Sequence, residues 1–125
     1  MAKTKKGLAS EVLADIIAHS MQEKKAVEII QMDLRNVGNA FCDFFVICTA
    51  NSDKQLDAIA EEISKEVYLG IKEHPLTKEG LPQNGWVLLD YFNVVVHIFL
   101  ADKRDKFGLE ELWGDAKTKK IEEGN

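Results

Sequence analysis

The sequence has no apolar run of the length that a membrane-spanning helix needs. Its basic start, residues 1–6, leads into an amphipathic pattern, so we expect no signal peptide. Cysteine is scarce: Cys42 and Cys48 are the two present. We place both in one strand, roughly 20 Å apart, which is too far for a disulfide. Unpaired thiols favour a reducing compartment, and we expect the protein in the cytoplasm.

The motifs of several enzyme classes are missing too. There is no glycine-rich phosphate loop, and no Gly-Ser turn is followed by the spaced carboxylates with which a nucleotidyltransferase holds its metal. The three histidines lack metal-ligand spacing with one another or with the cysteines, and no residue sits in a nucleophile elbow. We therefore expect no metal, no cofactor and no catalysis. The enzyme hypotheses that remain are Asp43 as a metal ligand and Asp90 with His97 as an acid–base pair.

The length and net charge of the chain indicate the number of domains and the kind of partner it can bind. The 125 residues suit one domain, and 46% apolar with 30% charged residues is an ordinary globular composition. We expect a domain over residues 7–113, between a flexible start at 1–6 and a disordered tail at 114–125. The net charge of −5 disfavours binding to a bare phosphate backbone, which requires clustered lysine and arginine.

Apolar residues at helical spacing predict two long helices. The first covers residues 7–23 and the second residues 51–72. Ser52 and Gln55 have the spacing of a capping box, which marks the start of the second helix.

Segments rich in valine and isoleucine predict the strands. We place strands at residues 26–34 and 41–50, and the second is so continuously apolar that it should lie centrally in the sheet. Residues 74–77 predict a short edge strand, because Pro75 blocks ladder pairing there. With a hairpin over residues 86–99, the chain is an α+β, or mixed α/β, domain with a sheet of four to five strands flanked by helices.

The hairpin can be given a register. A two-residue turn at Phe92 and Asn93 pairs Tyr91 with Val94 and Trp86 with Phe99. One face of the hairpin is then apolar or aromatic throughout: Val87, Leu89, Tyr91, Val94, Val96 and Ile98. The other face mixes large aromatic side chains with a carboxylate and an imidazole: Trp86, Leu88, Asp90, Val95, His97 and Phe99.

This second face has two interpretations. It is either a second buried face or an exposed aromatic patch that receives a partner, since aromatic side chains ringed by a few charges are typical of an interface centre. The segment after the hairpin leaves the same choice open. Residues 102–106 predict a solvated turn or short helix, and Leu109, Leu112 and Trp113 share one helical face. Trp113 therefore either packs on the sheet or extends the aromatic patch.

Several blocks together resemble the ribosomal silencing factor family, also called Iojap-like. The resemblance spans roughly residues 8–113, with all blocks in order. Two blocks are continuous, at residues 43–52 and 94–99. Single matching positions lie on either side of the second block: Trp86, Asp90, Arg104, Phe107, Leu109, Glu110, Leu112 and Trp113. The chain departs from the family at the hairpin turn, where the family has Gly-Asp, and at Phe107, where it has tyrosine.

The resemblance implies a fold likened to nucleotidyltransferases and a protein that binds the large ribosomal subunit. Its expected partner is ribosomal protein fourteen of that subunit, and binding there blocks the small subunit and lowers translation when nutrients are short. An acidic chain should dock on a basic protein surface, with little direct contact to rRNA. The expected contact or contact-supporting set is Trp86, Asp90, His97, Phe99, Leu109, Glu110 and Trp113. In that set Trp86 and Phe99 supply apolar area, and Asp90 and Glu110 meet basic side chains.

Two alternatives remain beside this expectation. One is a nucleotide-binding or nucleotidyltransferase-like enzyme that uses Asp43. The other is an interaction module whose aromatic face forms a homodimer, and this is compatible with ribosome binding if both compete for one face.

Overall fold

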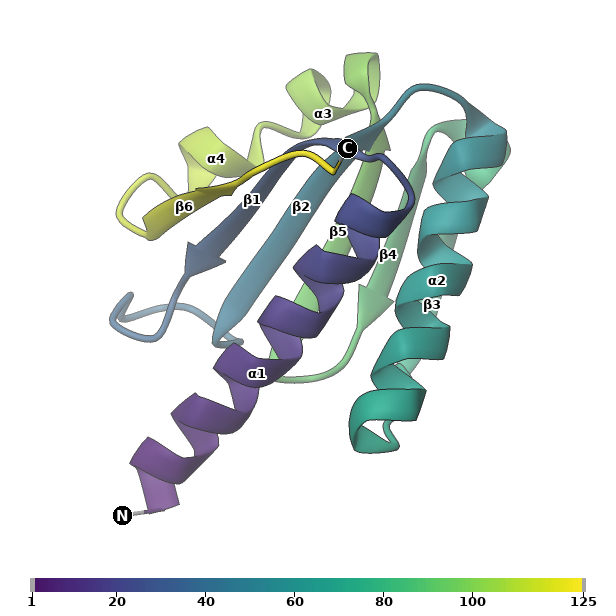
Figure 1. The fold of residues 1–125 in the computed structure, drawn as a ribbon. Coiled ribbons are helices and arrows are strands. Elements are labelled where there is room, and N and C mark those ends of the chain that lie inside the picture. Colours follow the sequence, from purple (N-terminus) through teal and green to yellow (C-terminus); the bar gives the residue numbers. More distant parts are fainter. Residues whose placement is uncertain (1, 125) are drawn as a thin grey trace.

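The computed structural model describes the backbone of residues 2–124 and the side chains from residue 9 onward. The helices pack around one mixed sheet of six strands in the order β3-β4-β5-β2-β1-β6 (Figure 1). The strands are β1 (Val27–Asp33), β2 (Phe44–Ala50), β3 (Thr77–Leu81), β4 (Trp86–Asp90), β5 (Val94–Leu100) and β6 (Lys117–Ile121). The helices are α1 (Ala2–Glu23), α2 (Asp53–Ile71), α3 (Ala101–Phe107) and α4 (Leu109–Leu112), with a 3-10 turn, η1 (Pro82–Asn84), before β4.

The sheet separates two apolar clusters. Strand β2 runs parallel to β5, and the other neighbouring strands are antiparallel. Helices α1 and α2 lie side by side across one face and bury the larger cluster with it (Figure 1). The smaller cluster lies on the opposite face, where Leu109 and Trp113 pack against it. All seven residues of β2 are buried, as expected for a central strand.

The predicted hairpin register is confirmed. Trp86 lies opposite Phe99, and Asp90 lies opposite Val95. The turn places Phe92 in the left-handed region, with φ of 76°. That conformation is costly for a side chain of this size, and the Asp90 carboxylate offsets part of the cost by accepting a hydrogen bond of 2.7 Å from the Phe92 amide.

Both predicted long helices are present, and their ends lie near the predicted ones except at the start of α1. The hydroxyl of Ser52 caps α2 by accepting from the Gln55 amide at 3.0 Å, and Lys72 ends the helix in a left-handed conformation. The Gln55 side chain accepts in return from the amide of Asn51, one residue before the cap. Helix α1 begins at Ala2, five residues before the predicted start. Among the described residues, no helix combines the length and apolar character that crossing a membrane requires.

Three predictions need correction. The sheet has six strands, because β6 forms within residues 114–125, for which the sequence predicts disorder. Backbone pairing with β1 orders this lysine-rich strand, so it needs no apolar alternation. The edge strand β3 begins at the last residue of the predicted segment 74–77, because Pro75 cannot donate to a ladder whereas Thr77–Leu81 can. Cys42 precedes β2 instead of lying in it, and both cysteines are buried and unpaired.

Candidate functional site

A cavity of about 410 Å³ opens on the sheet face opposite α1 and α2. We call it the aromatic pocket. Its apolar lining consists of Phe41, Phe45, Leu88, Val95, Leu109, Leu112 and Trp113. Its polar lining consists of Glu79, Asp90 and His97. Four of the seven residues expected from the sequence, Asp90, His97, Leu109 and Trp113, therefore lie in one cavity.

Strand pairing builds the floor of the aromatic pocket. The parallel register puts Phe45 beside Val95, and the hairpin register puts Leu88 beside His97. Because side chains alternate between the two faces of a strand, these four point to the face that α1 and α2 leave open. Glu79 on edge strand β3 lies beside Leu88 and extends this floor to the rim.

Trp113 forms the wall of the aromatic pocket. Its ring meets Phe45 edge-on at 5.9 Å and Phe41 at 6.3 Å. Phe41 is 70% exposed although it contacts both rings. An aromatic side chain so open to solvent beside a cavity is typical of a binding surface.

A second aromatic cluster lies next to the pocket but does not line it. Trp86 stacks on Phe107 at 5.5 Å, and Phe99 tilts against the same ring at 5.1 Å. Phe99 is only 1% exposed, so the expectation that it offers apolar area to a partner is corrected: it supports the pocket from within, stacked on His97. Both interpretations of this hairpin face therefore apply, to different residues. One part is core, and the other part lines an open cavity.

His97 is the buried polar group of the pocket. It is 8% exposed, touches Phe45 edge-on at 5.2 Å, and its Nδ1 has no hydrogen-bond partner among the described residues. Burial among rings disfavours the charged imidazolium and lowers the pKa of His97 to about 4. The side chain is therefore neutral near pH 7.

The catalytic hypotheses find little support in this geometry. Asp90 accepts from the Phe92 amide, and no hydrogen bond joins it to His97 within the described part of the chain. Burial raises the pKa of Cys42 and of Cys48 to about 12, which leaves both thiols protonated and weakly nucleophilic.

Asp43 has a structural environment. Its Oδ2 accepts a hydrogen bond of 2.6 Å from the Ser10 hydroxyl, and the side-chain Nδ2 of Asn93 donates to the same hydroxyl oxygen at 2.8 Å. These bonds tie α1 to the start of β2 and to the hairpin turn. In the part of the chain that the structure describes, no three His, Cys, Asp or Glu side chains are grouped as a metal site would need.

Glu110 is already engaged within the domain. Its carboxylate accepts from Nε of buried Arg104 at 3.3 Å. Arg104 also donates to the Thr49 hydroxyl at 2.9 Å and to the carbonyl of Glu28, which a bulge in β1 leaves outside the regular ladder. Glu110 was expected to meet the partner, but here it fixes α4, and with it the pocket wall, to the sheet. The carboxylates that line the pocket are those of Asp90 and Glu79.

Sequence patterns missed three lining residues: Phe41, Phe45 and Glu79. The parallel pairing of β2 with β5 carries Phe45 to His97, and periodicity does not reveal such pairing. Glu79 lies beyond residues 74–77, where the sequence predicted the edge strand. Phe41 contacts Trp113, and a contact between residues so far apart in the sequence leaves no local pattern by which it could have been predicted.

A family model described as "Ribosomal silencing factor during starvation" matches residues 8–125 of this chain. The chain belongs to the ribosomal silencing factor family. The match confirms the resemblance inferred from the sequence blocks and extends it beyond Trp113 through β6.

Individual members of the ribosomal silencing factor family agree with this assignment. The chain is 38% identical over 116 residues to ribosomal silencing factor RsfS of Halalkalibacterium halodurans, covering 92% of this chain and 97% of that protein. It is 41% identical over 102 residues to RsfS of Bacillus subtilis, covering 81% and 84%. A crystal structure from Bacillus halodurans superposes with a TM-score of 0.72 at 33% identity, covering 90% of this chain and 98% of the other.

Proposed function

We propose that this protein silences ribosomes by binding the large ribosomal subunit through the aromatic pocket and blocking association with the small subunit. The observation that carries the proposal is an open, aromatic cavity rimmed by carboxylates in a member of the ribosomal silencing factor family. The action is steric: it depends on occupying a surface, and no bond is made or broken.

The chemistry of the pocket supports a protein partner over RNA. Phe41, Leu112 and Trp113 offer apolar contact area, and Asp90 and Glu79 offer negative charge beside it. Carboxylates repel phosphates, so direct rRNA contact is disfavoured. The complementary surface carries a large apolar side chain together with lysine or arginine.

We propose ribosomal protein fourteen of the large subunit as that partner. A protein seated on the surface where the small subunit docks excludes it by volume alone, and this lowers translation under nutrient limitation. The proposal places the protein in the cytoplasm with the ribosomes. We also propose that the free protein self-associates weakly through the same face, so that dimer formation and ribosome binding compete.

The test is co-sedimentation of the purified protein with separated ribosomal subunits at moderate salt. We expect pelleting with the large subunit and loss of subunit joining when the protein is added. Absence of pelleting with either subunit would contradict the proposal. Calorimetric titration with a nucleotide and magnesium would then test the enzyme alternative, and light scattering would measure self-association.

A further inference from the structure

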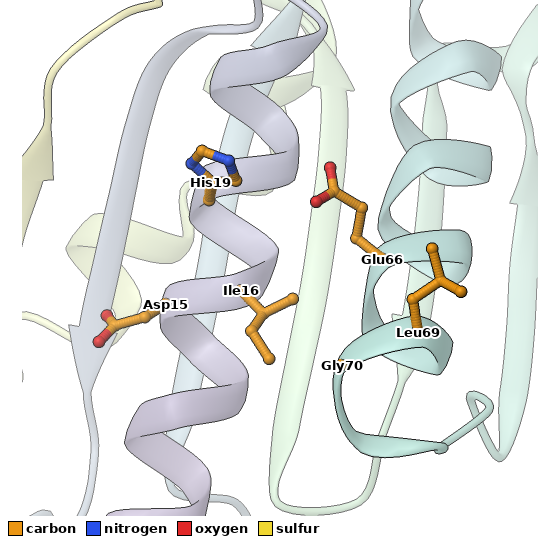
Figure 2. Close-up of a pocket in the computed structure, with 6 residues that line it drawn as sticks. All are labelled: Asp15, Ile16, His19, Glu66, Leu69 and Gly70. Atoms are coloured by element: carbon orange, nitrogen blue, oxygen red, sulfur yellow. The ribbon is translucent and has the colours of Figure 1, made fainter.

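A second cavity of about 480 Å³ lies on the other side of the sheet, between α1 and α2. We call it the helix groove. Figure 2 shows Ile16 of α1 and Glu66 of α2 pointing into the gap between the two helices, with Leu69 and Gly70 one turn further along α2. The aromatic pocket lies on the opposite sheet face, so the two cavities are independent.

The floor and rim of the helix groove are apolar. Ile16 is partly buried in the floor, and Gly70 faces it: a Cβ at Gly70 would lie 3.2 Å from Cδ1 of Ile16, so glycine here keeps the helices close. At the rim, Leu69 is 62% exposed. Val12, one turn before Ile16 on α1, is 52% exposed. Large apolar side chains held in a row on two helices are a surface that a third element can cover.

The charge at the groove is negative. Glu62 lies one turn away from Glu66 along α2, and burial together with this neighbouring carboxylate raises the pKa of Glu66. Lys24 reaches Glu62 at 3.9 Å, but no ion pair to Glu66 occurs among the described side chains. A cation placed beside Glu66 would remove the repulsion between the two carboxylates.

The other polar groups at the groove have partners within the chain. Asp15 accepts a hydrogen bond of 2.8 Å from the Gln31 side chain, and Figure 2 shows it pointing away from α2. His19 pairs with Glu23 at 3.0 Å along α1. Glu66 is thus the carboxylate that faces the gap.

We propose that the helix groove docks a cationic amphipathic helix of a protein partner. Its apolar residues would cover Ile16 and Leu69, and a lysine or arginine on the same helix would meet Glu66. The cleft between two packed helices has the ridges and spacing that accept a third helix. Carboxylates at the rim disfavour nucleic acid and anionic membranes, both of which carry phosphates.

The experiment is a selection from a phage-displayed library of helical peptides, each about four turns long, against the immobilised full chain. We expect the selected peptides to carry leucine or isoleucine at helical spacing with lysine or arginine on one flank. Amide chemical-shift changes on the labelled protein should then centre on Ile16, Glu66 and Leu69.

Matched variants separate a specific site from general attraction to an acidic protein. Glu66→Lys should weaken the selected peptides at least about fivefold, as should Leu69→Asn, which removes the apolar rim without a charge change. Glu61→Lys makes the same charge change on another face of α2 and should alter affinity less than about twofold. Circular dichroism establishes that each variant is folded.

Three results would overturn the proposal. They are a library that yields no peptide mapping to the helix groove, selected peptides without enriched positive charge, and an equal loss of affinity in Glu61→Lys and Glu66→Lys. Shifts confined to the aromatic pocket would likewise place the binding surface on the other face.

Discussion

Trp113 and Trp86 are both partly buried, but they have different neighbours. Trp113 lines the aromatic pocket beside solvent-exposed Phe41, whereas Trp86 stacks on Phe107 outside it. We expect Trp113→Ala to weaken large-subunit binding by about 2 kcal/mol or more, because aromatic anchors dominate interface energies. Co-sedimentation at increasing protein concentration measures this.

The matched change is Trp86→Ala. We expect it to weaken binding too, since the resemblance placed Trp86 in the contact set, but with a larger loss of stability because it removes the stack on Phe107. Urea unfolding of both variants separates the two effects. If Trp113→Ala unfolds the domain while Trp86→Ala does not, Trp113 is the residue that supports the fold, and its assignment as a partner-contacting wall is wrong.

His97 makes stability depend on pH. Its folded pKa of about 4 lies below the ordinary value of 6.5, so between these values the unfolded chain binds a proton that the folded chain does not. Stability is therefore fully present above pH 6.5 and falls as pH drops toward 4. At pH 5 the loss is about 2 kcal/mol relative to pH 7.

The measurement is urea unfolding at pH 7 and pH 5, for the natural chain and for His97→Gln. Other titrating groups contribute to both proteins, so the difference between them isolates the imidazole. An identical pH dependence in the two proteins would mean that His97 is protonated in the fold or is not buried.

At the level of elements, α3 and α4 depend on Arg104. Its guanidinium joins Glu28, Thr49 and Glu110, and its removal leaves buried acceptors without donors. We expect Arg104→Met to cost about 2–3 kcal/mol of unfolding free energy. Glu110→Gln should cost less than about 1 kcal/mol, because that carboxylate is half-exposed. Chemical denaturation tests both, and equal costs would contradict the anchoring role of Arg104.

Strand β6 gives a second prediction for an element. It pairs with β1 from Asp33 to Ile29, and Ile121 packs against the larger apolar cluster. A chain ending at Asp115 should have a lower urea midpoint and a stronger tendency to associate, because the edge of β1 is then unpaired. Unchanged stability, or fast hydrogen exchange at the β6 amides, would restore the disordered tail predicted from the sequence.

The elements that could be predicted are those determined by residues close together in the sequence. The hairpin register followed from alternation and from a two-residue turn, and the start of α2 followed from its capping residues. The pairing of β2 with β5 and of β1 with β6 could not be predicted, because the partners are distant and periodicity carries no information on which strands meet. The likeness to nucleotidyltransferase topology stays a prediction.

Because sequence patterns reveal local structure and not long-range pairing, they identified only part of the pocket lining. Asp90, His97, Leu109 and Trp113 were grouped correctly because their positions depend on the hairpin and on the segment just after it. The ion pair of Glu110 with Arg104 was not predicted, because Arg104 lies on the neighbouring helix α3 and is itself held by β1 and β2. No sequence pattern indicated that Arg104 bonds to these two strands.

For the whole molecule, charge should govern the salt dependence of binding. The net charge is −5, and the rim carboxylates of the aromatic pocket are the local negative groups. We expect affinity for the large subunit to fall as salt rises, and Glu79→Lys to weaken it several-fold with a smaller salt dependence. Glu61→Lys, on the opposite side of the sheet, is the control. Stronger binding of Glu79→Lys would indicate that the pocket faces rRNA.

The parallel pair at the centre of the sheet links the site to the folding of the whole chain. Phe44 pairs with Val94, so the pairing of β2 with β5 closes a loop that contains one long helix and two strands. Closing so long a loop is entropically costly and slows folding relative to local pairing. The floor of the aromatic pocket crosses this pair, from Phe45 to His97. We therefore expect the pocket to form together with this long-range pairing, so that a chain in which β2 and β5 are unpaired lacks the floor of the aromatic pocket.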